Sequence, residues 1–429
     1  MSFLRKGILV AGGQIVGVML SMVAGIINSR TLGPDGMGQY ELCQSVVYAV
    51  GTALALGIGS ANIYFINNRK ISADLITTNA LRAVTVFGVL IAAVGALIFC
   101  SFPDYFGAIP FLAAVTLGLG VAGFAGGLML RPILVAGMQA RRLVIADLTG
   151  FVVLLIGGAF LAAGGWLTTP RALMVLGLSF CSRLVLLVFL LRKHVNFALP
   201  FRWDLLWGVL GYGLKLGAAT VLVGLTGNVT VMLLRYLGPG AFDDIGLYGR
   251  AVAVSSLILL VPYALAPLLY AKFAGSEGQE RAGQAERAIR MSAVYGLATA
   301  LVVVLMGKYV IWILYGREFL GAQKALVFLA PALFLVPISS VCTNLLAGAG
   351  RAMTRVFLAV GTLLVTGGVV YLLVPVWGIC GAATGALVGN AFAALTLMAV
   401  CRKLYGLNLY RCLILQKDDV RYIRNALKG

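Results

Sequence analysis

Charged residues are scarce in this sequence. They make up 11% of its 429 residues, whereas a typical soluble domain carries about 25%. Hydrophobic residues make up 61%, more than water can solvate in a chain of this composition. The shortage of charge therefore excludes a soluble globular protein. It indicates an all-α polytopic membrane protein. The length of such a chain bears on its number of membrane spans rather than of globular domains.

Residue types that carry catalysis or bind metals are also sparse. The chain has one histidine, His194, in a basic turn, and seven cysteines that are scattered singly without a Cys-x-x-Cys pair. This pattern excludes a disulfide framework and a zinc-type site. The sequence contains no Ser/His/Asp or paired-carboxylate set. We therefore expect no catalytic residue, metal or cofactor, and no enzymatic activity.

Acidic residues are few as well, 14 against 33 basic residues, which gives a net charge of +19. This excess does not indicate nucleic acid as a partner, because basic patches for phosphate binding lie on solvated surfaces. The tendency of cytoplasmic loops to carry Lys and Arg explains most of it. Most basic residues fall in alternate turns, which predicts an inner (cytoplasmic) membrane protein with both termini in the cytoplasm.

Apolar runs of about 20 residues, each long enough to cross a bilayer of about 30 Å, predict twelve spans. The first run follows Arg5 and Lys6; it is too long for a signal peptide and lacks a cleavage site. The expected spans are approximately 7–29, 39–66, 83–102, 110–130, 143–163, 172–191, 207–234, 246–271, 291–315, 322–348, 356–375 and 378–401.

A five-residue phrase occurs twice, half a chain apart. Arg30-Thr31-Leu32-Gly33-Pro34 and Arg235-Tyr236-Leu237-Gly238-Pro239 follow spans one and seven, and each precedes a Gly-x-Tyr, at Gly38 and Gly246. A weaker echo follows spans four and ten, at 137–141 and 348–351. Such repeats predict two six-helix halves related by a pseudo-two-fold axis along the membrane normal, around a central cavity.

The expected domains are an N-terminal six-helix bundle (1–202), a C-terminal six-helix bundle (203–401) and a basic cytoplasmic tail (402–429). The tail alternates apolar and basic residues. It either lies on the anionic inner leaflet or forms a disordered basic segment.

Four cations interrupt the apolar spans: Arg131, Arg183, Lys215 and Arg250. Each costs about 2.5–3.5 kcal/mol at a helix centre that faces lipid, so we expect them to face a protein interior or an aqueous cavity. For Arg131, Lys215 and Arg250 the alternative is snorkelling or anchoring at the membrane interface. Arg183 lies near the middle of its span and is the strongest candidate for substrate binding.

Only two carboxylates, Glu41 and Asp147, lie near or within spans, so positive charge remains in excess there. A cationic cavity suits an anionic substrate such as a pyrophosphate, whose oxygens arginine binds bidentately. Asp147 is expected to pair with its neighbours Arg141 and Arg142. The amide of Asn228 either lines the cavity or bridges helices.

Three residues near the outer face are candidates for gating. Arg30 and Arg235 end their helices, where a cation also stabilises the C-terminal dipole. Glu41 opens the second span; it pairs with Arg30, carries a coupling proton, or lies in the interface.

These phrases, together with Tyr315-Gly316-Arg317-Glu318-Phe319 after span nine and Gly350-Arg351 after span ten, are in register with the twelve spans. The sequence thus resembles the polysaccharide transport branch, the O-antigen and lipid-linked oligosaccharide flippases, of the multidrug/oligosaccharidyl-lipid/polysaccharide (MOP) exporter superfamily. The resemblance implies a flippase of lipid-linked oligosaccharide that works by alternating access. The expected carrier lipid is undecaprenyl diphosphate.

The resemblance also implies a monomer in contact with membrane lipids, with polysaccharide polymerase or assembly proteins as further partners. Many relatives carry an acidic residue in span seven, where this chain reads Gly227-Asn228-Val229-Thr230. The alternative function is a cation-coupled drug or metabolite antiporter of the same superfamily, for which cavity carboxylates are expected. A major-facilitator carrier is disfavoured because its signature is absent from 67–82, and a membrane enzyme because long outer loops are absent.

Overall fold

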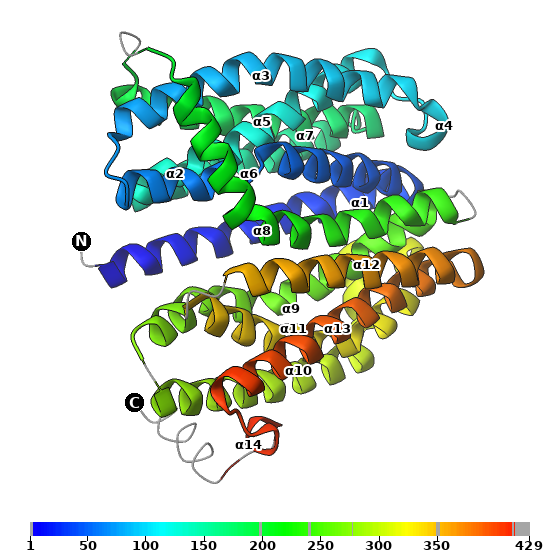
Figure 1. The fold of residues 1–429 in the computed structure, drawn as a ribbon. Helices are drawn as coiled ribbons and strands as arrows, with labels where there is room; N and C mark the ends of the chain where they lie inside the picture. Colours follow the sequence, from blue (N-terminus) through cyan, green and yellow to red (C-terminus); the bar gives the residue numbers. More distant parts are fainter. Residues whose placement is uncertain are drawn as a thin grey trace. The chain divides into compact units, whose positions relative to one another are not determined.

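A computed structural model describes residues 3–196, 200–238, 242–276, 278–348, 352–413 and 416. Within these ranges the chain is helical and contains no strand (Figure 1). The all-α class predicted from the apolar runs is confirmed. In chain order the helices are α1 (Phe3–Ala55), α2 (Ile58–Asn67), α3 (Ala73–Ser101), α4 (Pro103–Phe106), α5 (Phe111–Ala136), α6 (Ala140–Ala163), α7 (Thr169–Leu191), η1 (Arg192–His194), α8 (Trp203–Leu237), α9 (Phe242–Ala274), α10 (Gly278–Tyr315), η2 (Arg317–Gly321), α11 (Ala322–Gly348), α12 (Ala352–Trp377), α13 (Ile379–Tyr405) and α14 (Leu409–Leu413).

The described residues contain eleven helical segments that are long and apolar enough to cross a membrane. The first, Leu9–Asn67, has 59 residues and would extend about 90 Å as one straight helix, far more than a bilayer. Gly33 interrupts it with non-helical backbone angles (φ 67°, ψ −178°), followed by Pro34. This segment therefore supplies the first two predicted spans, and the other ten segments correspond to the remaining ten.

A second break, at Leu56–Gly57, separates α1 from α2, and both residues have positive φ (45° and 69°). Glycine is required at position 57 because a Cβ there would overlap the carbonyl oxygen of Gly213 and lie 2.7 Å from the Cα of Gly217, both on α8. Glycines on both helices thus let α8 approach the α1–α2 break.

By internal contacts the chain forms two compact units. Unit 1 comprises Met1–Gly249 and Leu314–Phe319, and unit 2 comprises Arg250–Ile313 and Leu320–Gly429. In unit 1, α3 packs on α5, α5 on α7, and α6 on both α1 and α7, while α8 packs on α1 and α2. The domain boundary at 202/203 stays a prediction. Residues 239–241 and 349–351, which complete the second copies of the two sequence repeats, lie outside the described residues.

Small residues bring the helices of unit 1 close together, as expected where lipid provides no hydrophobic drive for association. A Cβ on Gly177 of α7 would overlap the carbonyl oxygen of Thr116 on α5. Gly13 and Gly17 of α1 face Val144 and Phe151 of α6, where an added Cβ would lie 2.6–2.9 Å from side-chain atoms. Helix spacing in this unit is therefore set by glycine.

In unit 2, α13 packs on both α11 and α12. Its glycines 381, 385 and 389 face the backbone or side chains of α12. α13 ends at Gly406 in the left-handed region (φ 67°), with Arg402 and Lys403 in its last turn, a favourable combination for a helix C-terminus.

The short α14 is held against unit 2: the guanidinium of Arg290 donates to the carbonyl of Arg411, and the Glu286 carboxylate accepts from the backbone amide of Asn408 at 2.7 Å. The predicted tail, 402–429, is described only to 413 and at 416, so the choice between a membrane-bound and a disordered tail stays open.

Candidate functional site

The carboxylate of Asp147 on α6 is shared by two arginines. Arg131 on α5 binds it through Nε, 3.0 Å from each carboxylate oxygen, and through Nη2 at 2.9 Å. Arg183 on α7 donates a single Nη2 hydrogen bond of 2.7 Å to Oδ1. All three side chains are mostly buried, with exposed fractions of 26%, 15% and 19% for Arg131, Asp147 and Arg183. We call these three residues the Asp147 cluster.

Close packing of α5, α6 and α7 creates this cluster. A Cβ on Gly150 of α6 would lie 3.1 Å from the carbonyl oxygen of Ser179 and 3.6 Å from the Cβ of Arg183, so α6 runs directly against α7. Asp147 lies one turn before Gly150 on the same helix. From there its carboxylate reaches Arg183 on one side and Arg131 on the other.

The Asp147 cluster carries two positive charges and one negative charge. Arg131 binds both oxygens of the carboxylate through two nitrogens of its guanidinium, a strong bidentate arrangement. Arg183 uses one nitrogen, and its buried Nε has no hydrogen-bond partner among the described residues. The cluster thus retains a net positive charge and an unsatisfied donor, both suited to an anion.

Aromatic rings occupy the same region of unit 1. Tyr48 of α1 is close enough to Arg183 to interact with its charge. The Tyr48 ring lies 4.9 Å from that of Phe124 and 5.7 Å from that of Phe180, centroid to centroid. Tyr48 thus joins the neighbourhood of Arg183 to an aromatic group on α1, α5 and α7.

The structure corrects one pairing predicted from the sequence. Asp147 is a charge partner, as expected, but of Arg131 and Arg183 rather than of its neighbours Arg141 and Arg142. The guanidinium of Arg142 instead donates to the side chain of Gln139 at 2.7 Å. For Arg131, an ion pair thus replaces the snorkelling alternative.

The other predicted substrate-binding residues lie on α8 and α9. Lys215 is exposed on α8. The side-chain amide of Asn228, also on α8, donates to the carbonyl of Gly224 on its own helix at 2.7 Å. Arg250 on α9 is 6% exposed, so it is buried in the protein. Their roles in binding stay predictions.

The predicted gating residues lie at the end of the helices opposite to the Asp147 cluster, where the repeated phrases end spans one and seven. Arg30 Nε donates to the carbonyl of Leu314, at the end of α10, at 3.0 Å. Arg235 donates to the carbonyls of Tyr105 and Asp104 of α4, both at 2.7 Å. Each arginine therefore binds carbonyls that end another helix, as a cation does favourably.

Further contacts surround Arg235 in the second copy of this arrangement. The guanidinium of Arg235 lies 3.9 Å from the centre of the Phe242 ring. The Tyr105 hydroxyl donates to the carbonyl of Met232 at 2.8 Å, and burial raises the pKa of Tyr105 to about 12, so the phenol keeps its proton at neutral pH. Gln39 of α1 donates to the carbonyl of Phe106 at 2.9 Å.

Around the first copy of the repeated phrase, two acidic side chains lie close to the backbone of glycines. A Cβ on Gly33 would lie 3.4 Å from a carboxylate oxygen of Glu318. The Glu41 side chain lies over Gly249, where an added Cβ would be 2.9 Å from its Cγ. Glu41 is thus positioned beside the start of α9.

Sequence reasoning missed the segment that Arg235 binds, although a signal was present. Asp104-Tyr105-Phe106-Gly107-Ala108 follows span three, and Glu318-Phe319-Leu320-Gly321-Ala322 follows span nine. Both read acidic, aromatic, apolar, Gly, Ala. Aligning the two halves beyond the Arg-x-Leu-Gly-Pro phrase would have revealed a third repeat.

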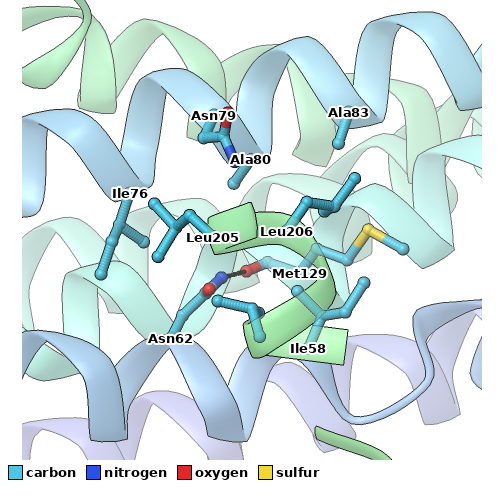
Figure 2. Close-up of a pocket in the computed structure, with 10 residues that line it drawn as sticks. Ile58, Asn62, Ile76, Asn79, Ala80, Ala83, Met129, Leu205 and Leu206 are labelled. Carbon is cyan, nitrogen blue, oxygen red and sulfur yellow. Dashed lines mark hydrogen bonds between the residues drawn. The ribbon is translucent and has the colours of Figure 1, made fainter. Parts of the chain in front are cut away.

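A small pocket in unit 1 is too small for a substrate. Figure 2 shows its lining, mostly apolar side chains around Asn62 and Asn79. Its volume is about 20 Å³, room for about one water molecule. Asn62 donates to the carbonyl of Met129 at 3.0 Å, and Asn79 pairs with both backbone groups of Arg202 at 3.0 and 3.2 Å. Both asparagines are therefore structural ties between helices and linker.

Within the described residues, no three His, Cys, Asp or Glu side chains are grouped as metal ligands would be. The sequence matches no family model and no curated protein.

Solved structures match over nearly the whole chain. The inward-facing conformation of a multidrug resistance MATE family transporter of the MOP superfamily superposes with a TM-score of 0.75 and 18% identity, over 91% of this chain and 94% of that chain. The outward-facing conformation of such a transporter gives a TM-score of 0.67 and 19% identity, over 94% and 95%.

A third match is a MOP superfamily transporter from Pyrococcus furiosus described by a "reverse polarity of binding pocket" that "suggests different function". It has a TM-score of 0.69 and 18% identity, over 94% of this chain and 95% of that chain. At these identities the likeness establishes architecture. The fold of this chain is that of the MATE transporters of the MOP superfamily.

Proposed function

We propose that this protein is a flippase that moves a lipid-diphosphate-linked oligosaccharide from the cytoplasmic to the outer leaflet by alternating access. The Asp147 cluster carries the proposal. Two guanidiniums share one carboxylate on three packed helices that are apolar enough to cross a membrane. Ionisable residues within such helices are costly and mark substrate pathways. An excess of arginine there suits a diphosphate headgroup, whose oxygens accept bidentate hydrogen bonds.

The two arginines have different tasks in this proposal. Arg131 engages Asp147 through both nitrogens of its fork and fixes the carboxylate. Arg183 binds through one nitrogen and has a free buried Nε, so it is the guanidinium that can receive a phosphate oxygen. Lys215, Arg250 and Asn228 remain proposed contacts of the same substrate.

The charge bias of the turns supports an inner-membrane location with both termini in the cytoplasm, and we propose a monomer that works with polysaccharide assembly proteins. The Pyrococcus furiosus protein is described by a binding pocket of reverse polarity that suggests a different function, so pocket polarity varies within this fold. The competing function is a cation-coupled drug antiporter. Asp147 argues against it, because this carboxylate is already neutralised by two arginines.

The test is leaflet transfer in liposomes. Purified protein is reconstituted with fluorescent undecaprenyl-diphosphate-linked sugar, and transfer is scored by quenching from outside, with and without imposed ion gradients. We expect transfer by the native chain and at least a tenfold loss in Arg183→Gln. Arg171→Gln is the matched control, because Arg171 lies on the same helix, exposed, and donates only to the carbonyl of Trp166.

Equal transfer by native protein and Arg183→Gln contradicts the assigned role of Arg183. Absence of transfer, together with gradient-driven uptake of a cationic drug, contradicts the flippase and favours the antiporter.

A further inference from the structure

The two glycines of the repeated Gly-x-Tyr motifs are packed against each other. Gly38 lies on α1 and Gly246 on α9, both within unit 1. A Cβ on Gly38 would lie 3.0 Å from the backbone nitrogen of Gly246, and a Cβ on Gly246 would lie 3.1 Å from the backbone nitrogen of Gly38. The contact is therefore reciprocal, as a two-fold relation between the repeats requires.

The symmetry extends to the neighbouring turns. A Cβ on Gly38 would overlap the carbonyl oxygen of Phe242, four residues before Gly246. A Cβ on Gly246 would overlap the carbonyl oxygen of Pro34, four residues before Gly38. Both obstacles are backbone atoms, which cannot move aside as a flexible side chain does. The contact exists only because both residues lack a Cβ.

The two arginine contacts are reciprocal in the same way, because each joins one sequence half to the other. Arg30 ends the first span of one sequence half and binds the carbonyl of Leu314, at the end of the third span of the other half. Arg235 ends the first span of the second half and binds carbonyls of Tyr105 and Asp104, just after the third span of the first half. Residues from both sequence halves are thus joined at one end by equivalent bonds.

We propose that the Gly38–Gly246 contact and the two arginine contacts form a clasp that closes the outer mouth of the transporter and must open for release of substrate. The inference rests on the alternating access of the proposed function, and it assigns gating to named residues. The two glycines contribute no side chains to this contact, so none of theirs must be repacked when it separates and re-forms.

The inference is tested by adding one methyl group at each glycine. We compare Gly38→Ala, Gly246→Ala and the double variant with Gly12→Ala on α1 and Gly227→Ala on α8. A Cβ on either control glycine meets no atom within 4 Å. Spin labels are attached at Asp35→Cys and Asp243→Cys, exposed positions beside the two motifs, in a chain whose seven native cysteines are replaced by alanine.

We expect a short label-to-label distance in the native background. Each clasp variant should move at least a tenfold larger fraction to a longer distance, and both control variants should match the native chain. Arg30→Gln and Arg235→Gln add no steric clash and should shift the distribution in the same direction by a smaller amount. Hydrogen exchange of the amides in 34–41 and 242–249, in the chain with its native cysteines, should accelerate in the same variants.

An unchanged distance distribution and unchanged exchange in the double alanine variant would overturn the clasp. So would an equal shift in Gly12→Ala and Gly227→Ala. These measurements need no substrate. A chain that shows the shift but fails to transfer lipid-linked sugar therefore keeps the clasp and loses the proposed substrate, whereas the reverse result loses the clasp alone.

Discussion

The two sequence halves differ most where the first carries charge. Gly137 and Gly348 mark the repeated turns after spans four and ten. Arg131 lies six residues before the first of these glycines, and Cys342 lies six residues before the second. Arg131 holds an ion pair, whereas Cys342 is fully buried in an apolar core with Phe273, Leu345 and other hydrophobic residues.

The same contrast holds ten residues after each glycine. Asp147 occupies this position in the first half, and Leu358, which packs against the apolar core of unit 2, occupies it in the second. At both equivalent positions the second half thus has an uncharged side chain packed in an apolar core. Since apolar residues often replace buried ion pairs without loss of stability, the difference argues that the first half retains its charges for function rather than for packing.

The largest effect is expected for removal of the shared carboxylate. Asp147→Ala leaves two guanidiniums without a counter-charge among packed helices. It should destabilise the protein by about 3–5 kcal/mol, as breaking a buried pair does. The measurement is thermal unfolding in detergent. Asp147→Asn should lie close to Asp147→Ala, because the loss is of charge rather than of volume.

Leu358→Ala is the matched control in the second half. It should cost less than about 2 kcal/mol, below the range for truncating a fully buried leucine, because Leu358 is only partly buried. If Asp147→Ala and Leu358→Ala lose the same stability, the charge at position 147 has no special effect. The distinction between the halves then disappears.

A second experiment converts the first half to the chemistry of the second. The triple variant Arg131→Leu, Asp147→Leu, Arg183→Leu removes the Asp147 cluster as a unit and leaves no buried charge unpaired. Its stability should stay within about 2 kcal/mol of the native protein or rise above it, while transfer of lipid-linked sugar falls at least tenfold. Thermal unfolding and the liposome assay are read on the same preparation.

The outcome separates two roles. Retained stability with lost transfer supports a functional cluster. If transfer persists in the stable triple variant, the charges are dispensable and the comparison between the halves carries no functional meaning.

Much of the architecture could be predicted because a bilayer fixes the length of each apolar run. The twelve predicted spans correspond to the long helices, and the non-helical backbone at Gly33 divides the first long segment into two of them. The break at Leu56–Gly57 was not predicted. α8 approaches this break closely at Gly213, a tertiary contact that no local pattern reports.

The site was predictable in part. Scarcity alone singled out Arg131, Arg183 and Asp147, since each charge within a span requires an explanation. Their pairing was not predictable, because the partners are 16 and 36 residues apart and meet only through the rotation of α5, α6 and α7 about their axes. Likewise the repeated Gly38 and Gly246 were visible, but their mutual contact depends on how two helices cross.

The smallest expected effect is the difference between the variants of the two repeated arginines, Arg30 and Arg235. Arg235 is half-buried, donates to two carbonyls and lies over the Phe242 ring, whereas Arg30 is exposed and donates to the carbonyl of Leu314. A hydrogen bond from a charged donor contributes about 1.5 kcal/mol or more when sheltered and less when exposed, and a cation–π contact adds about 0.5–1 kcal/mol. Arg235→Gln should therefore loosen its target more than Arg30→Gln does.

Hydrogen exchange measures this difference directly. Amides of 103–107 should exchange about tenfold faster in Arg235→Gln, the change that a loss of about 1.4 kcal/mol gives, and amides of 315–319 less than about threefold faster in Arg30→Gln. Tyr236→Ala, next to Arg235 but exposed, with 73% of its surface accessible, serves as the control and should leave both segments unchanged. Equal acceleration in the two arginine variants would show that the copies hold their targets alike, so that divergence between the halves is confined to the buried charges.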